Sequence, residues 1–339
     1  MNIPYRTRRV LKRLAVILLI ICLIVAVASL VWFLWLQRYV VYTRDRGAVF
    51  DMSLPDKIAP GELAQKPKPP EDISIYYNEG ENSLNTSNDL QQFVGYYADS
   101  AALSEGVGTV LSQVQALPAG TPVMVDVKSP KGSFFYSSSV SSSRYSYIDP
   151  AAMDELIAYL ADSDLYAIAR LPALRDYAYG LNHVPDGLPT AGGYLWADED
   201  YCYWLNPGSQ GTLTYLIQIV TELKNLGFDE VVFQDFYFPD TNEIVFKSDK
   251  AQTLAAAAKT LVTTCSTDTF TLSFVGQDPS FTLPEGHCRL YAQGVAAALV
   301  ESYASQVGIE DPAKLVFLTE IHDTRFDTYS VLRPLDAAH

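Results

Sequence analysis

The chain has 339 residues, of which 39 are acidic and 24 are Lys or Arg, so its formal net charge is −15 at pH 7. This length holds one large domain with appendages, and the acidic excess argues against a nucleic acid or an anionic lipid surface as a partner. Its four histidines and four cysteines show no H-E-x-x-H or C-x-x-C spacing. We therefore expect no metal site and no cofactor, and a Cys265–Cys288 disulfide remains open.

The first predicted element is a membrane helix. Leu14–Leu36 is a 23-residue run without a charge, long enough to cross about 30 Å of bilayer. Five basic residues precede it within residues 1–13, and Trp32 and Trp35 lie near its far end. Positive charge marks the cytoplasmic side, so we expect the rest of the chain to be extracytoplasmic. A cleaved signal peptide is the alternative, with Ala26–Ala28 as its cleavage site, but the apolar run continues past that site.

The exported part is expected to contain a linker and one domain. Residues 37–89 are rich in Pro, Lys and Glu around Lys66–Pro70, which predicts a semi-rigid spacer. No acidic residue precedes Asp45, so the part beyond the anchor carries 19 basic and 39 acidic residues. That balance favours a neutral or cationic substrate.

Strand-like and helix-like segments then alternate through the domain at 90–339. The predicted strands are Phe93–Tyr97, Val123–Val127, Tyr166–Arg170, Val231–Phe236, Phe270–Phe274, Arg289–Ala292 and Leu315–Thr319. The predicted helices include Ala102–Leu117, Pro150–Ala161, Leu213–Leu226, Lys250–Thr263 and Val295–Val307. Such alternation predicts an α/β fold with a parallel sheet, and at this length a TIM (β/α)8-type barrel. Thr328–Arg333 is a poor eighth strand, so a barrel incomplete at that strand stays open.

Two loops carry unusual compositions. Ser137–Ser143 is almost entirely serine, and Leu171–Pro207 holds Trp196 and Trp204, the two tryptophans that lie beyond the membrane segment. Aromatic faces over a barrel mouth are suited to stacking on sugar rings, and they are equally suited to pinning the loop to the barrel. Both interpretations stay open.

The segment Gly227–Asp240 is the most informative part of the domain. Gly227 ends an amphipathic helix, and Val231–Phe233 reads as a buried strand of a parallel sheet. Asp235 then follows the strand. Ligands and chemistry collect at the C-terminal ends of parallel strands, so Asp235 is a candidate functional carboxylate.

Five segments, in order, resemble the "putative glycoside hydrolase domain" family, TIM-barrel proteins of the bacterial envelope. They are Val94-Gly-Tyr-Tyr97, Val123-Met-Val-Asp-Val-Lys-Ser-Pro-Lys-Gly132, Tyr166-Ala-Ile-Ala-Arg170 with Arg175-Asp176, Trp204-Leu-Asn-Pro207, and Gly227-Phe-Asp-Glu230 with the strand after it. The resemblance implies a barrel that hydrolyses glycosidic bonds in a polysaccharide. The chain departs from the family pattern at Gln234, where the family has an acid, and at Tyr237, where it has an arginine.

Glycosidic hydrolysis generally uses two carboxyl groups from different strand ends. By analogy of position, Asp235 is the expected acid/base and Glu320, at the end of the seventh strand, its partner; for Glu320 a solvated strand-end carboxylate is the alternative. Asp126 and Lys128 share one strand face, so they either pair structurally or bind substrate. Arg170 binds substrate, orients Asp235 or pairs with Asp126.

The sequence therefore leads to a membrane-anchored extracytoplasmic glycoside hydrolase that acts on a cell-envelope or extracellular polysaccharide. Its expected substrate contacts are Asp126, Lys128, Arg170, Trp196, Trp204 and Tyr237. The alternative is a non-catalytic barrel that binds a glycan or a partner protein at the cell surface. A polysaccharide deacetylase lacks metal ligands here, and a serine hydrolase lacks a G-x-S-x-G segment.

Overall fold

The computed structural model describes five stretches of the chain, namely residues 40–43, 47–50, 90–140, 146–277 and 281–338. The predicted tail 1–13 and membrane segment 14–36 lie outside these stretches, as does the centre of the spacer. Among the helices that the structure does describe, none is both long enough and apolar enough to cross a bilayer. The chain divides into two compact units, Met1–Glu79 and Gly80–His339.

The first unit contains a short antiparallel pair of strands. Strand β1 (Val40–Thr43) pairs with β2 (Gly47–Phe50), with Val40 opposite Phe50 and Thr43 opposite Gly47. The spacer prediction for residues 37–89 contained no strand, so this pair was not anticipated.

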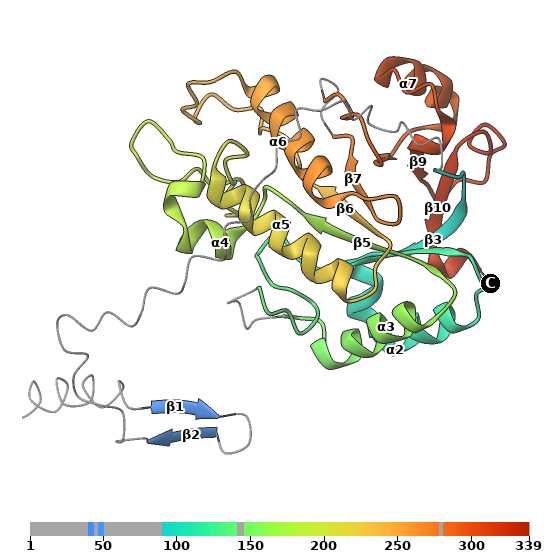
Figure 1. Ribbon diagram of the computed structural model, residues 1–339, viewed down its shortest axis with the longest axis horizontal. Coiled ribbons are helices and arrows are strands. Elements are labelled where there is room, and N and C mark those ends of the chain that lie inside the picture. The colour runs from blue at the N-terminus through green and yellow to red at the C-terminus, as the bar shows by residue number, and fades with distance from the viewer. Residues whose placement is uncertain (1–39, 44–46, 51–89, 141–145, 278–280, 339) are drawn as a thin grey trace, which may run out of the picture. The chain divides into compact units, whose positions relative to one another are not determined.

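The second unit is a closed barrel of eight parallel strands in the order β10-β3-β4-β5-β6-β7-β8-β9 (Figure 1). The strands are β3 (Val94–Ala98), β4 (Pro122–Asp126), β5 (Tyr166–Pro172), β6 (Glu230–Gln234), β7 (Thr271–Val275), β8 (Leu290–Gln293), β9 (Leu315–Leu318) and β10 (Ser330–Pro334). The TIM-type fold predicted from strand–helix alternation is therefore confirmed.

The eighth strand closes this barrel, so the incomplete barrel that the sequence left open does not form. In β10, Val331 pairs with Val94 of β3 on one side and with Phe317 of β9 on the other. The strand holds only two strongly apolar residues in a row, Val331 and Leu332, and ends at Pro334. Its local pattern is weak because its stability comes from pairing with two strands distant in sequence.

Helices join the strands and lie outside the barrel, where α5 and α6 run side by side (Figure 1). The α-helices are α2 (Ser100–Gln115), α3 (Pro150–Asp162), α4 (Tyr177–Asn182), α5 (Gln210–Asn225), α6 (Lys250–Cys265) and α7 (Val300–Val307). Short 3-10 turns are η2 (Val184–Asp186), η3 (Ala297–Leu299), η4 (Pro312–Lys314) and η5 (Leu335–Ala338). Helix α7 begins five residues later than predicted, after η3, and α4 within the long aromatic loop was not predicted.

Side chains at the helix starts explain where most of these helices begin. Five of the α-helices start directly after a residue whose side chain accepts a hydrogen bond from a first-turn N–H group. These capping residues are Asp99, Asp149, Asp176, Ser209 and Asp249.

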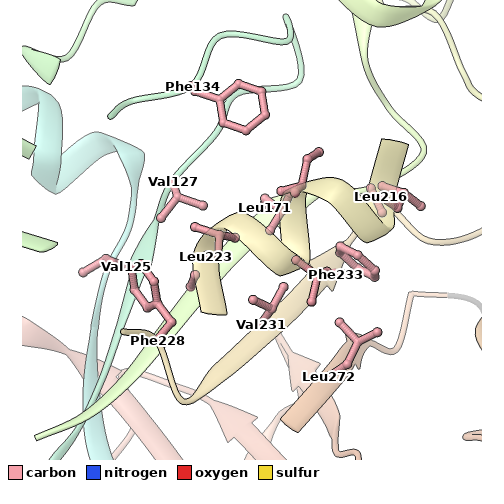
Figure 2. Close-up of a cluster of buried hydrophobic side chains, with 14 of the residues drawn as sticks. Val125, Val127, Phe134, Leu171, Leu216, Leu223, Phe228, Val231, Phe233 and Leu272 are labelled. Atoms are coloured by element: carbon pink, nitrogen blue, oxygen red, sulfur yellow. The ribbon is translucent and has the colours of Figure 1, made fainter. Parts of the chain in front are cut away.

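Alternation along the strands separates an outer core from an inner one. Outward-facing residues pack against α5, as Figure 2 shows for Val125, Val231 and Phe233 beside Leu216 and Leu223. A second buried cluster belongs to the inner face and contains Met124, Ile168, Val232, Tyr291, Val316 and Leu332. Since successive strand residues point to opposite faces, this division assigns a face to each residue at the barrel mouth.

Candidate active site

Three residues at the barrel mouth lie on its inner face. Asp126, Arg170 and Gln234 each follow an inner-face residue of their own strand by two positions. Nε of Arg170 donates to Oδ1 of Asp126 at 2.6 Å, and Nη2 donates to Oδ2 at 3.2 Å. Of the roles considered for Arg170, the structure thus shows the ion pair with Asp126. Asp126 also accepts the N–H of Ser100 at 2.7 Å, so its carboxylate is held by two elements.

Lys128 has a different partner from Asp126. Its Nζ lies 2.7 Å from Oδ2 of Asp176, and both side chains are 0 % exposed. The same ammonium group donates to the carbonyl oxygen of Pro172 at 3.2 Å. The expected Asp126–Lys128 pair therefore does not form. Each residue instead belongs to a separate ion pair that connects the β4 and β5 ends.

Asp235 occupies a strained and buried position immediately after β6. Its φ angle is +54°, in the left-handed region that non-glycine residues rarely adopt. The residue is only 6 % exposed. Its Oδ1 accepts a hydrogen bond from Nε2 of Gln277 at 3.2 Å, and its buried Oδ2 has no hydrogen-bond partner among the described residues. Burial raises the pKa of this carboxyl above its ordinary value, although the Gln277 amide and the charges of Arg175 and Lys128 act in the opposite direction.

The aromatic loop is attached to the barrel next to Asp235. The ring of Trp204 lies 4.9 Å from that of Tyr237 in an edge-on arrangement, and its Nε1 donates to Oδ2 of Asp198 at 3.0 Å. Trp204 is 3 % exposed, so its ring faces are occupied by protein. Trp196 is half-buried and donates to Glu243 at 2.8 Å. For Trp204 the loop-pinning interpretation agrees with this geometry, whereas Trp196 and Tyr237 keep part of their surface accessible.

Arg175 forms ion pairs with two aspartates of the same loop, a role that the sequence analysis did not predict. Its Nε lies 2.5 Å from Oδ2 of Asp198, and its Nη2 lies 2.5 Å from Oδ2 of Asp200. Asp198 in turn accepts the N–H groups of Asp200 and Cys202, at 3.0 and 2.9 Å, and so organises the turn. The only sequence signal for this arrangement was an arginine at a strand end followed by a loop rich in acids.

Glu320 lies at a different part of the mouth from Asp235. It is exposed, and it lines a cavity of about 460 Å³ together with Tyr97, Asp99 and Asp336. Burial raises the pKa of Tyr97, and the negative charge of Glu320 is the next largest cause of the increase. Asp235 does not line this cavity. The structure therefore places both proposed carboxyl groups at strand ends without showing a contact that joins them.

The opposite end of the barrel contains a buried charge cluster that the sequence analysis did not identify. Glu230 is fully buried and pairs with Nη1 of Arg289 at 2.6 Å. The hydroxyl groups of Ser273 and Tyr166 also donate to its carboxylate, at 2.5 Å and 3.0 Å respectively. The signal was available in the alternation of Glu230 with Val232, which places both on the inner face.

The last candidates are the cysteines and a metal site, considered over the described part of the chain. Cys202, Cys265 and Cys288 are buried and free, so the disulfide left open between the last two does not form. Burial raises the pKa of the Cys265 thiol to about 11, which leaves it protonated near neutral pH. Within the same described ranges, no cluster of three or more His, Cys, Asp or Glu side chains is arranged to hold a metal ion.

Comparison with solved structures returns several glycosidases of low identity. The glycoside hydrolase domain of PelA from Pseudomonas aeruginosa is 12 % identical, with a TM-score of 0.44, over 72 % of this chain and 96 % of that one. A hypothetical protein from Ruminiclostridium thermocellum ATCC 27405 is 20 % identical, with a TM-score of 0.45, over 53 % of this chain and 96 % of that one. The α-galactosidase TtGalA from Thermus thermophilus is 13 % identical, with a TM-score of 0.44; the alignment covers 66 % of this chain but 46 % of the galactosidase.

No curated protein matches the chain in sequence. A family model described as "Putative glycosyl hydrolase domain" matches residues 99–269, which is just over half of the 339 residues. The matched region runs from the cap of α2 to the end of α6 and includes Asp126, Arg170 and Asp235. The chain therefore belongs to this glycosyl-hydrolase-like family.

Proposed function

We propose that the barrel hydrolyses glycosidic bonds, with Asp235 as the general acid. One observation carries this proposal: a carboxyl group at a strand end is buried, and one of its oxygens, also buried, has no hydrogen-bond partner in the described part of the chain. Burial disfavours its charged form, so Asp235 retains its proton to a higher pH than an exposed aspartate does. A general acid needs a proton to give to the leaving-group oxygen, and a free oxygen atom from which to give it.

The partner carboxylate in this proposal is Glu320, which is exposed at the end of β9 and can activate a water molecule or attack the sugar. A separation of about 5–5.5 Å between the two carboxyl groups would give retention, and about 6.5–9.5 Å inversion. Trp196 and Tyr237 are proposed to contact the sugar through their accessible surfaces, and the Asp126–Arg170 pair through its edge at the mouth. Lys128 and Trp204 are buried, so they support this surface from beneath.

A second function is favoured by Gln234. Its place on the inner face, at the position where the family resemblance puts an acid, leaves a neutral amide at the centre of the mouth. An amide can hydrogen-bond a sugar hydroxyl, but it cannot donate a proton as an acid does. On this alternative the barrel binds a glycan without cleaving it.

Reducing-end release from bacterial envelope polysaccharides by the purified chain tests the two functions. We expect Asp235→Asn and Glu320→Gln to lower the rate by at least about 100-fold, because each removes a group that acts in the transition state. The control Asp240→Asn changes an exposed aspartate five residues further on and should keep the wild-type rate. Glycan binding by a wild-type chain that releases no reducing ends would support the binding function instead.

We further propose that residues 14–36 anchor the chain in the cell membrane, with residues 1–13 inside the cell, 37–89 as the spacer, and the domain at 90–339 outside. The uncharged 23-residue run and the basic residues before it support this placement. It would bring the barrel next to cell-envelope or extracellular polysaccharide. Protease treatment of intact cells tests the orientation, since an extracytoplasmic domain is cleaved and a cytoplasmic one is protected.

A further inference from the structure

Gln277 contacts Asp235 at two atoms. Its Oε1 accepts the backbone N–H of Asp235 at 2.7 Å, and its Nε2 donates to Oδ1 of the Asp235 side chain at 3.2 Å. A backbone N–H can only donate, so the amide oxygen of Gln277 must face it. The amide nitrogen is then left on the carboxyl side. The orientation of the Gln277 amide is thus fixed by its partners.

The backbone around Gln277 is held by the neighbouring strand. The N–H of Gly276 donates to the carbonyl of Tyr291 in β8 at 2.8 Å, and the N–H of Gln277 donates to Val275 at 3.1 Å. A Cβ atom at Gly276 would lie 2.8 Å from the hydroxyl of Tyr303, so the chain passes close to α7 at this point. The end of β7 therefore brings Gln277 to Asp235 from a defined direction.

The contact acts on a residue whose backbone is strained. Left-handed conformations are unfavourable for a non-glycine residue, and they persist where several contacts from the surroundings fix the backbone. Besides Gln277, the N–H of Leu174 donates to the carbonyl of Asp235 at 3.3 Å. Residues that follow two adjacent strands thus hold the backbone of Asp235, and among the residues that the structure describes only Gln277 also binds its carboxyl group.

We propose that Gln277 is a positioning residue that binds Oδ1 of Asp235 and so leaves Oδ2 to carry the proton toward the scissile bond. The inference rests on the proposed hydrolase function. The proton on Oδ2 passes to the glycosidic oxygen as the C–O bond breaks, and the bonding electron pair leaves with that oxygen. The anomeric carbon then bonds either to the oxygen of a water molecule, whose proton passes to Glu320, or to the Glu320 carboxylate itself. Asp235 becomes a carboxylate, and the amide N–H of Gln277 stabilises its new charge at Oδ1.

Two substitutions separate the two halves of the contact. Gln277→Glu is close in shape and keeps an oxygen for the N–H of Asp235, but when ionised it cannot donate to Oδ1. Gln277→Leu removes both hydrogen bonds. Gln115→Leu, at an exposed position of α2, is the matched control. The pKa of Asp235 is followed by carbon NMR of the aspartate-labelled chain, with the signal assigned by its loss in Asp235→Asn.

Because the Gln277 amide lowers the pKa of Asp235, both Gln277 variants should make Asp235 titrate at a higher pH than in the wild type. The alkaline limb of the kcat/KM profile should move in the same direction, and Gln277→Leu should lower kcat/KM by about 10-fold or more, as the loss of a hydrogen bond to a charged group does. Gln115→Leu should change neither quantity. Unchanged titration of Asp235 in both variants would overturn the proposal. If the wild type releases no reducing ends but the titration moves as expected, the contact is supported and the hydrolase function fails.

Discussion

Replacement of Lys128 by methionine tests the buried ion pair that joins the ends of β4 and β5. The Asp176 carboxylate is fully buried and accepts the Tyr215 hydroxyl and the Tyr179 N–H, both at 2.8 Å, in addition to its 2.7 Å contact with Lys128. The variant keeps these two neutral donors and loses the only cation paired with Asp176 in the described structure. Removing one partner of a buried pair typically costs about 3–5 kcal/mol, because the other charge remains without compensation. We expect the free energy of unfolding to fall by about that amount.

Urea unfolding measures this loss, with tryptophan fluorescence as the signal because Trp204 lies in the loop that follows Asp176. The double variant Lys128→Met/Asp176→Asn should regain part of the loss, since it removes both charges. Arg325→Met is the matched control: it breaks a 2.7 Å pair with Asp323 at the surface, where solvent screening leaves little to lose. A loss below about 1 kcal/mol in the single variant, or strict additivity in the double, would refute the reasoning.

Three further predictions concern stability. Arg289→Met should lower the free energy of unfolding by about 3–5 kcal/mol, because Glu230 then lies buried without its cation; an unchanged melting temperature would contradict this. Gly132→Ala should destabilise the fold by more than about 1 kcal/mol, since φ is +82° there and the new Cβ would meet the Asp176 carboxylate; urea unfolding decides it. The wild type should lose free energy of unfolding as the pH rises from about 3.9, the pKa of an unfolded aspartate, through the raised pKa of folded Asp235, because burial disfavours the ionised carboxylate. Asp235→Asn should therefore gain stability relative to the wild type over that window, and a pH-independent difference in melting temperature would exclude this account.

Much of the barrel was predictable because its signals are local. The strand starting at Tyr166 was placed at its observed first residue, and that starting at Leu315 likewise. A run of apolar residues, a capping aspartate such as Asp149 and a helix-ending glycine such as Gly227 each act within a few residues. Where the pattern was short or interrupted, as in α4 and η3, the prediction missed the element or its start.

The site was less predictable, because its side-chain partners are distant in sequence. Asp235 was identified from its place at a strand end, but its contact with Gln277 spans 42 positions. Lys128 was placed on the second strand, which ends two residues earlier at Asp126, and only the folded loop shows that its partner is Asp176. Local patterns assign a residue to a strand face, whereas they do not specify which side chain from another element will meet it there.

The sequence by itself determined that the chain forms a parallel α/β barrel with a carboxylate at the end of β6, because apolar periodicity and helix-capping residues act over short segments. Tertiary structure alone decided that β10 closes the barrel, since that strand is stabilised by pairing with β9 and β3 at once. It also decided which oxygen of Asp235 is bound and which is free. Burial and long-range contacts set that choice, because the low polarity around a carboxyl group depends on every element packed against it.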